Sequence, residues 1–112
     1  MFFLAPEVLK EEPYTEKSET YAFGVIMWEL IARKHPYSEY RWMWELENAV
    51  IQGKRPLIPS DCPDSWRKLM EACWAPDPAI RPPFARIYAA LKDMQPAILA
   101  YEKELMSKAV QK

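Results

Sequence analysis

Three glutamates near the start of the chain are the first residues whose type and spacing could support acid–base chemistry. Glu11, Glu12 and Glu16 fall within one short stretch. Two carboxylates can share the work of a hydrolase when a pocket holds them at a fixed separation. Nothing in the sequence pairs these side chains with a pocket or with His35, the only histidine. We therefore interpret them as a solvated charge run in a loop, and His35 as a loop residue near the end of a helix.

The two cysteines, Cys62 and Cys73, could in principle hold a metal ion or form a disulfide. Their spacing fits no common metal-ligand pattern, and His35 is the only histidine that could join them. We expect free, buried thiols in a reducing compartment, with a disulfide as the less favoured alternative.

The composition predicts a single folded domain. The chain has 112 residues, half of them apolar, and a formal net charge of −1, which is unlike a disordered or nucleic-acid-binding segment. No stretch has the form of a signal peptide or the length of a membrane span. Eleven prolines against two glycines favour stiff connectors between helices. We expect a cytoplasmic protein with neither nucleic acid nor membrane as a partner.

The segment from Ser18 to about Ala32 predicts the central element. Ser18 is a good N-cap, and Pro36 lies beyond the predicted end. Its apolar residues go round the helix instead of forming one stripe, so we expect a helix that is buried on all sides. Gly24 in its middle weakens the helix by about 1 kcal/mol, which suggests that another segment approaches its backbone closely.

Three amphipathic segments are expected to surround this helix, and a short helical turn begins near Ala5-Pro6. They span residues 40–52, 63–74 and 84–94. After Pro96 a weaker pattern predicts a surface helix or a frayed tail. Trp42 and Trp44 are two positions apart on a helix, so both cannot face the core. No run alternates like a strand, and the chain is predicted to be all-α. The expected core includes Phe23, Trp28, Trp74 and Phe84.

Several short motifs occur in order along the chain. They are Ala5-Pro6-Glu7, Lys17 to Val25, Trp28-Glu29-Leu30, Cys73-Trp74, and Asp77 with Arg81-Pro82 and Phe84. In this order and spacing the chain resembles the C-terminal part of the large lobe of a protein kinase catalytic domain, from the tyrosine-kinase or tyrosine-kinase-like branch. The resemblance covers residues 3 to about 94. It divides the chain into a kinase part, 1–94, and a C-terminal helical extension or tail, 95–112.

The resemblance assigns structural roles to specific residues. It makes 18–32 the buried central helix of a helical C-lobe subdomain, and Glu7 and Arg81 a structural ion pair. A planar guanidinium can hold a carboxylate through two hydrogen bonds, and we expect burial because Trp74 and Phe84 bracket the arginine. Glu19 stands where the family usually has aspartate, as the anchor of the catalytic loop in the parent.

The same resemblance implies a function for a longer parent protein. Kinases transfer the γ-phosphate of ATP to protein hydroxyls with Mg²⁺, a catalytic base and a phosphate cradle. Those motifs lie upstream of Ala-Pro-Glu in the family, so we expect no catalytic, cofactor-binding or metal residues in this chain, with ATP and Mg²⁺ belonging to the parent. Serine/threonine specificity through the tyrosine-kinase-like branch is favoured over tyrosine. Phe2 and Phe3 fall where the family forms part of a substrate pocket.

Two alternatives stay open, a pseudokinase scaffold, which Glu19 favours, and a stand-alone helical interaction module. The expected partners are the missing N-lobe and catalytic loop, and a protein substrate or regulator of the parent. In the family, the preceding helix and the catalytic loop cover part of the 18–32 helix. Without them we expect an exposed apolar face that can drive self-association.

Overall fold

The computed structural model describes residues 4–110, and this part of the chain contains only helices and their connections. Their bounds are α1 Pro6–Leu9, α2 Glu16–Ala32, α3 Met43–Ile51, α4 Asp64–Cys73, the 3-10 helix η1 Pro78–Ile80, α5 Phe84–Asp93 and α6 Gln95–Val110. The all-α prediction is confirmed. No described helix is long and apolar enough to span a membrane.

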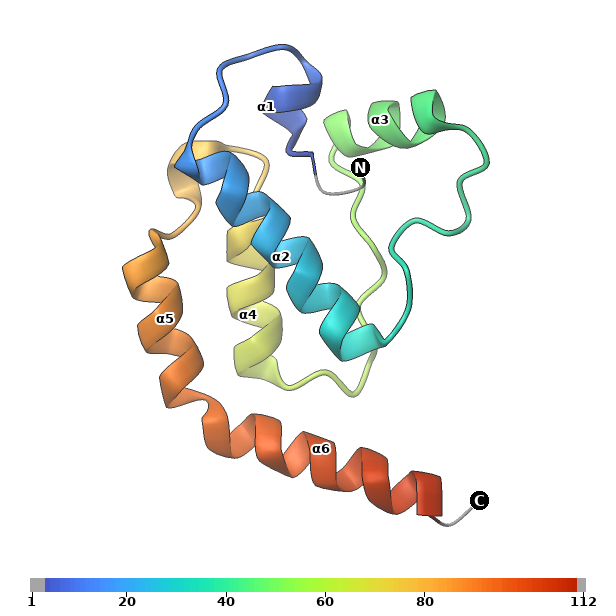
Figure 1. Ribbon diagram of the computed structural model, residues 1–112, viewed down its shortest axis with the longest axis vertical. Helices are drawn as coiled ribbons and strands as arrows, with labels where there is room; N and C mark the ends of the chain where they lie inside the picture. Colours follow the sequence, from blue (N-terminus) through green and yellow to red (C-terminus); the bar gives the residue numbers. More distant parts are fainter. Residues whose placement is uncertain (1–3, 111–112) are drawn as a thin grey trace.

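Helix α2 is the axis on which the other elements are arranged. Figure 1 shows α4 running beside α2, with α5 beyond α4, α1 and α3 at one end of the body, and α6 crossing the other end. The Cα atoms extend 47 × 35 × 18 Å. A helix with its side chains is about 10–12 Å across, so a body this thin covers α2 from one side and not from both.

The packing of α2 on α4 explains the glycine in the middle of α2. A Cβ atom on Gly24 would lie 3.0 Å from the Cys73 Cβ and 3.2 Å from the carbonyl oxygen of Met70. Both Met70 and Cys73 are completely buried. The predicted close approach at Gly24 is confirmed, and α4 is the segment that makes it.

The start of α2 differs from the prediction. Thr15 is the N-cap: its hydroxyl oxygen accepts a hydrogen bond from the Lys17 amide, and the Ser18 hydroxyl accepts one from the Thr15 amide at 3.2 Å. Ser18 therefore lies inside the first turn, not at its cap. The predicted cap was wrong because threonine and serine three residues apart are both suitable, and only the contacts decide between them.

We expected α2 to be buried on all sides, and this expectation was wrong. Ile26 is 39% exposed and Leu30 is 63% exposed, while Phe23 is half-buried. Phe84 is 42% exposed, so its placement in the core was wrong. Its ring packs edge-on against Phe23, with the centroids 6.1 Å apart. These rings lie at the border of the packed region, where the flat body ends.

The remaining large side chains follow the helical patterns in part. Trp28 and Trp74 are buried as expected. Trp42, the N-cap residue of α3, and Trp44, in the first turn of α3, are both exposed. Cys62 and Cys73 are free and buried, as predicted. The segment predicted as a surface helix or a frayed tail is a regular helix, α6, and Met94 alone separates it from α5.

Candidate functional site

The structure brings Glu7 and Arg81 together, although 74 positions separate them. Glu7 lies on α1 and Arg81 follows η1. The two guanidinium Nη atoms donate to the two carboxylate oxygens, Nη1 to Oε2 at 2.7 Å and Nη2 to Oε1 at 2.9 Å. Arg81 is 1% exposed and Glu7 6% exposed. The result is a buried, bidentate ion pair that ties α1 to the segment directly after η1.

Each N–H group of the Arg81 guanidinium has an acceptor. Beyond Glu7, Nη1 donates to the Lys17 carbonyl at 2.8 Å and Nε to the Ala75 carbonyl at 2.8 Å. The Nη2 atom also makes a longer contact of 3.4 Å with the Pro76 carbonyl. A buried charge costs little only when its hydrogen bonds are complete. One side chain thereby joins α1, α2 and the loop that follows α4.

Two further residues of this site were missed by the sequence reasoning. The Ser18 hydroxyl donates to Glu7 Oε2 at 2.9 Å. The ammonium group of Lys17 donates to the Arg81 carbonyl at 2.6 Å, in return for the bond that the Lys17 carbonyl accepts. We call Glu7, Lys17, Ser18 and Arg81 the anchor. Ser18 was predicted as the first residue of the central helix, and Lys17 precedes it, but neither position indicated a shared partner.

The electrostatics of the anchor favour the ionised carboxylate. Burial alone would raise the pKa of the Glu7 carboxyl. The hydrogen bonds from Arg81 and Ser18, together with the positive charge of Arg81, outweigh that effect and hold the pKa below its ordinary value. Glu7 is thus an acceptor held in its charged form, suited to a structural lock and not to proton transfer near neutral pH.

An aromatic ring that the sequence reasoning did not predict covers the Arg81 guanidinium. The Arg81 Cζ atom lies 5.1 Å from the ring centroid of Tyr21, and the Arg55 Cζ atom lies 4.9 Å from the same centroid. Tyr21 is 1% exposed, and burial raises its pKa. We had expected Trp74 and Phe84 to bracket the arginine. Trp74 is buried, but Phe84 is partly exposed and packs against Phe23 instead. Cation–π contact with Tyr21 provides the apolar cover.

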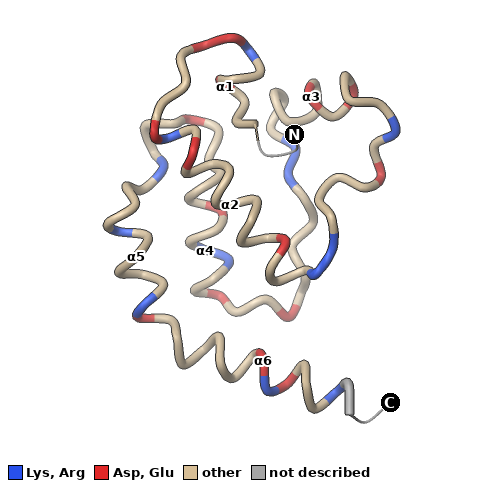
Figure 2. The backbone as a smooth tube through the Cα atoms, viewed as in Figure 1, with Lys and Arg blue, Asp and Glu red and all other residues tan. Residues whose placement is uncertain are grey.

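Glu19 stands at the head of an exposed apolar stripe on α2. It is exposed in the first turn, and Phe23, Ile26 and Leu30 follow it at helical spacing along the same side. We call these four residues the open face of α2. Figure 2 shows no charged residue along the middle of α2, between Glu19 and Glu29. Glu19, which we expected to hold the catalytic loop of the parent, therefore lies beside an exposed apolar surface.

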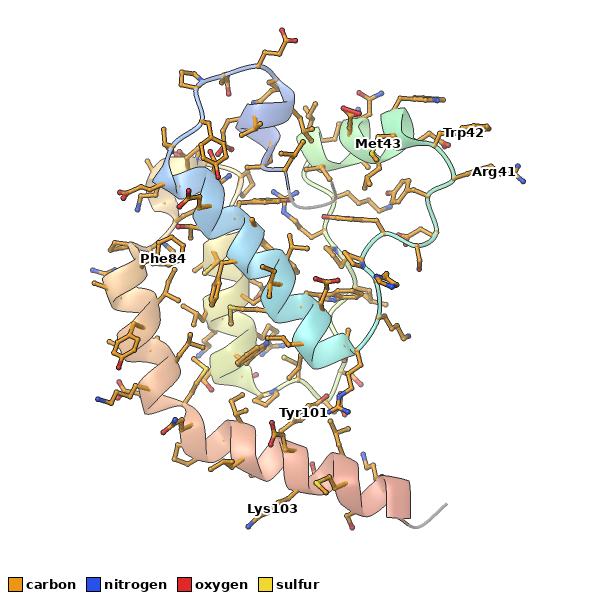
Figure 3. All side chains as sticks on the ribbon, viewed as in Figure 1. Arg41, Trp42, Met43, Phe84, Tyr101 and Lys103 are labelled. Carbon is orange, nitrogen blue, oxygen red and sulfur yellow. The ribbon has the colours of Figure 1, made fainter. Side chains whose placement is uncertain are left out.

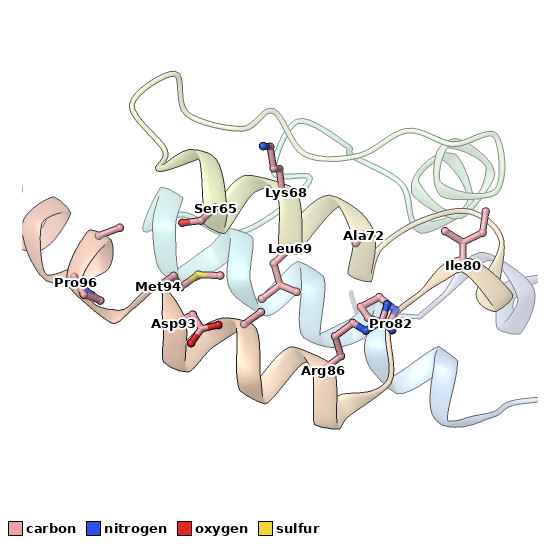
Figure 4. A pocket seen from close by; sticks show the side chains of 12 residues that line it. Ser65, Lys68, Leu69, Ala72, Ile80, Pro82, Arg86, Asp93, Met94 and Pro96 are labelled. Carbon is pink, nitrogen blue, oxygen red and sulfur yellow. The ribbon is translucent and has the colours of Figure 1, made fainter.

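A groove runs between α4 and α5, from Ile80 and Pro82 to the start of α6. Its volume is about 710 Å³, and it lies between α4, α5 and the start of α6. Figure 4 shows Leu69 and Met94 on its apolar floor, with Arg86 and Asp93 at different ends. Only Pro96 and Ala97 of α6 line it, at one end of the groove.

One pair of predicted site residues lies outside the part of the chain that the structure describes. Phe2 and Phe3, the possible substrate-pocket residues, lie outside the described residues. Within residues 4–110, no group of three or more His, Cys, Asp or Glu side chains is arranged to hold a metal ion.

Comparison with known proteins adds an independent line of evidence. A family model described as protein tyrosine and serine/threonine kinase matches residues 1–91. A probable LIM domain-containing serine/threonine-protein kinase of Dictyostelium discoideum is 41% identical over 86% of this chain and 15% of its own length. From the same organism, cyclic GMP-binding protein C is 44% identical over 80% of this chain and 4% of its own length. The dual specificity protein kinase shkC, also from this organism, is 42% identical over 80% of this chain and 18% of its own length. The chain thus spans less than a fifth of each of these relatives.

Proposed function

The chain belongs to the family of protein tyrosine and serine/threonine kinases, and we propose that it is the helical base of a kinase domain whose parent protein phosphorylates protein hydroxyls in cytoplasmic signalling. The observation that carries the proposal is the buried, bidentate Glu7–Arg81 pair. It fixes the short α1 segment to the body of the fold. In our proposal this holds the end of the parent's activation segment in place.

The division of labour within the parent follows from the chemistry of phosphoryl transfer. That reaction depends on positioning and on charge stabilisation by a phosphate cradle, Mg²⁺ and a base. We assign those parts, and the binding of ATP and Mg²⁺, to the parent's segments upstream of α1. The role of residues 1–94 is to support them, and residues 95–112 form an extension. The open face of α2 is the seat that we propose for the catalytic loop and the helix before it.

Serine/threonine specificity, through the tyrosine-kinase-like branch, is the version that we favour. Support comes from the relatives' names, since the LIM domain-containing relative is named a serine/threonine kinase. Another relative is named a dual specificity kinase, which keeps tyrosine as a possible substrate. The branch itself rests on the resemblance of residues 62–94 alone.

A pseudokinase scaffold is the second candidate, and Glu19 is the observation that favours it. The family usually has aspartate here, and the longer side chain moves the carboxylate by about one C–C bond length. If that displacement uncouples the catalytic loop from α2, the parent keeps the kinase shape and serves as a binding scaffold. A stand-alone helical interaction module is the third reading.

A chimera tests the proposal. Residues 5–94 replace the matching segment of the LIM domain-containing Dictyostelium kinase, and phosphoryl transfer to a generic protein substrate is measured, followed by phosphoamino-acid analysis. We expect transfer to serine and threonine, and no saturable binding of Mg-ATP by the 112-residue chain alone in calorimetry.

The Glu19→Asp chimera separates the candidates. Comparable activity with either residue supports an active parent, whereas activity only with aspartate supports the scaffold. A chimera that melts as cooperatively as the parent kinase but transfers no phosphate with either residue contradicts the proposal. Stoichiometric Mg-ATP binding by the chain alone contradicts the assignment of the nucleotide site to the upstream segments.

A further inference from the structure

Helix α6 begins after the segment matched by the kinase family model, which ends at residue 91. One side of α6 holds it to the body. Tyr101 is buried and its hydroxyl donates to the Ile31 carbonyl at 3.3 Å, while Ile98 and Leu105 pack against the core. Figure 3 shows Tyr101 pointing from α6 toward α2, and Lys103 pointing the opposite way.

One solvent-exposed side of α6 is amphipathic in its own right. Leu99 is 58% exposed and Met106 is 69% exposed, and Glu102 and Lys103 lie between them, both exposed. With 3.6 residues per turn, these four positions fall within about 100° around the helix. We call them the outer stripe of α6. An apolar residue at each end and two opposite charges in the middle form a pattern that is complementary to itself.

We propose that the outer stripe pairs with the same stripe of a second copy of this chain, with the two helices antiparallel. A two-fold axis between Glu102 and Lys103 places Leu99 opposite Met106 of the second copy. It also places Glu102 opposite Lys103 of the second copy. The interface is isologous, so each of these contacts occurs twice.

Charge complementarity selects this arrangement over the parallel one. A parallel pair in register sets Glu102 against Glu102 and Lys103 against Lys103, and like charges at these positions repel. The antiparallel pair replaces both repulsions by attractions and also opposes the two helix dipoles.

The expected association is weak because the interface is small. The 16 residues of α6 span about 24 Å, and only two apolar side chains per copy lie in the stripe. The surface area that such a contact buries is therefore well below the roughly 1,600 Å² of a standard stable interface. We expect a dissociation constant on the order of 100 μM to 1 mM.

The first experiment measures sedimentation at up to about 1 mM protein, a range set by this weak affinity. All variants carry Ile26→Gln and Leu30→Gln, so that the open face of α2 does not contribute. Glu102→Lys alone and Lys103→Glu alone should each weaken dimerisation roughly tenfold or more. The double exchange, Glu102→Lys with Lys103→Glu, recreates both opposite-charge pairs and should restore it.

A matched control uses Glu104, which is exposed on another side of the same helix. Glu104→Lys makes the same change in net charge as Glu102→Lys and should leave dimerisation unchanged. Circular dichroism checks that every variant keeps α6 helical. A monomer at about 1 mM overturns the proposal, and so does a double exchange that fails to restore the dimer.

A second experiment reads the register directly. In the Leu99→Cys/Met106→Cys variant, the two positions within one helix are about 10.5 Å apart by helical rise, too far for a disulfide. Mild oxidation should therefore join position 99 of one copy to position 106 of the other. Peptide mapping that finds 99 joined to 99 indicates a parallel pair and overturns the proposed arrangement.

Discussion

At the scale of single residues, the anchor shows why the surroundings of an ion pair matter more than its distance. Lys10 and Glu12 also form an ion pair, at 3.8 Å, but their side chains are 48% and 54% exposed. Water screens such a pair, and it contributes about 0–1 kcal/mol. The Arg81 side chain is fully buried, and protein acceptors replace all the water that it has lost. Removing one member of such a set leaves a buried charge without its partner.

The first prediction concerns the stability of anchor variants. Glu7→Ala and Arg81→Ala should each destabilise the fold by about 3–5 kcal/mol, because each leaves an unpaired buried charge. The double variant should lose much less than the sum. Urea melts measure all three free energies of unfolding. Glu12→Ala, which breaks the exposed pair, is the control and should change stability by about 0–1 kcal/mol. Additive single losses within that same small range would contradict a role for the pair.

The second prediction is a pH dependence that depends on Glu7. Its folded-state pKa lies below the ordinary value of 4.5, so the unfolded chain binds a proton before the folded chain does. The stabilisation from the ionised carboxylate is fully present above pH 4.5, and it is lost as the pH falls from there through the folded-state pKa.

Urea melts between neutral pH and the acid range measure this effect. Glu7→Gln does not titrate, so its deficit in stability relative to the unmodified protein should shrink as the pH falls below 4.5. Glu12→Gln, at an exposed position, should run parallel to the unmodified protein. A deficit for Glu7→Gln that stays constant across this range would mean that the folded-state pKa is not lowered.

At the scale of helices, the absence of a side chain at Gly24 allows the close approach of α4 to α2. Cys73 and Met70 of α4 come so close that no Cβ atom fits in the ordinary range of contacts. Glycine weakens a helix interior by about 1 kcal/mol relative to alanine, and the closer packing of two buried helices compensates for this. The anchor reinforces the same arrangement, because Lys17 and Ser18 lie in the first turn of α2.

The third prediction is that Gly24→Ala destabilises the protein although alanine is the better helix former. The added methyl group would lie 3.0 Å from the Cys73 Cβ, and backbone atoms of Met70 and Trp74 stand at 3.2 and 3.3 Å. Backbone cannot move aside as a side-chain tip can, so a strain of about 1–3 kcal/mol should exceed the gain in helix propensity. Thermal melts followed by circular dichroism test this, and a raised melting temperature would refute it.

At the scale of the whole molecule, the flat shape leaves a side of α2 open. The radius of gyration is 15.0 Å, whereas a compact chain of this length would have about 13 Å. The exposed residues Ile26 and Leu30 of α2 lie on the same side of the helix as Phe23, which borders Phe84 of α5. Uncovered apolar surface of this kind marks a place where another segment or protein binds.

The fourth prediction is that the isolated chain binds a hydrophobic dye through the open face of α2. Ile26→Gln with Leu30→Gln should lower the dye fluorescence and the tendency to self-associate. Leu57 and Ile80 are 89% and 68% exposed elsewhere, and their double glutamine variant is the matched control, which should have little effect. Equal fluorescence from both double variants, or none from the unmodified chain, would mean that the open face is not a binding surface.

The sequence by itself determined most of the helices and the reason for Gly24. Helical periodicity is a local property, so residues 63–74 and 84–94 were placed close to α4 and α5, and a glycine inside an apolar helix indicated a close neighbour. The motifs also pointed to the family. The pairing of Glu7 with Arg81 came from that resemblance, because no pattern within either segment refers to the other.

Only the tertiary structure decided which apolar residues are covered. By residue type, core positions would be expected for Phe84, Trp42 and Trp44, yet all three side chains are exposed. The apolar pattern of α2 predicts a fully buried helix, yet two of its apolar residues are exposed. The roles of Lys17 and Ser18 in the anchor were equally hidden. A side chain's type sets how much free energy its burial would release, but burial depends on which distant segments reach it. Phe84 reaches Phe23 at one end of the open face, whereas Ile26 and Leu30 stay exposed.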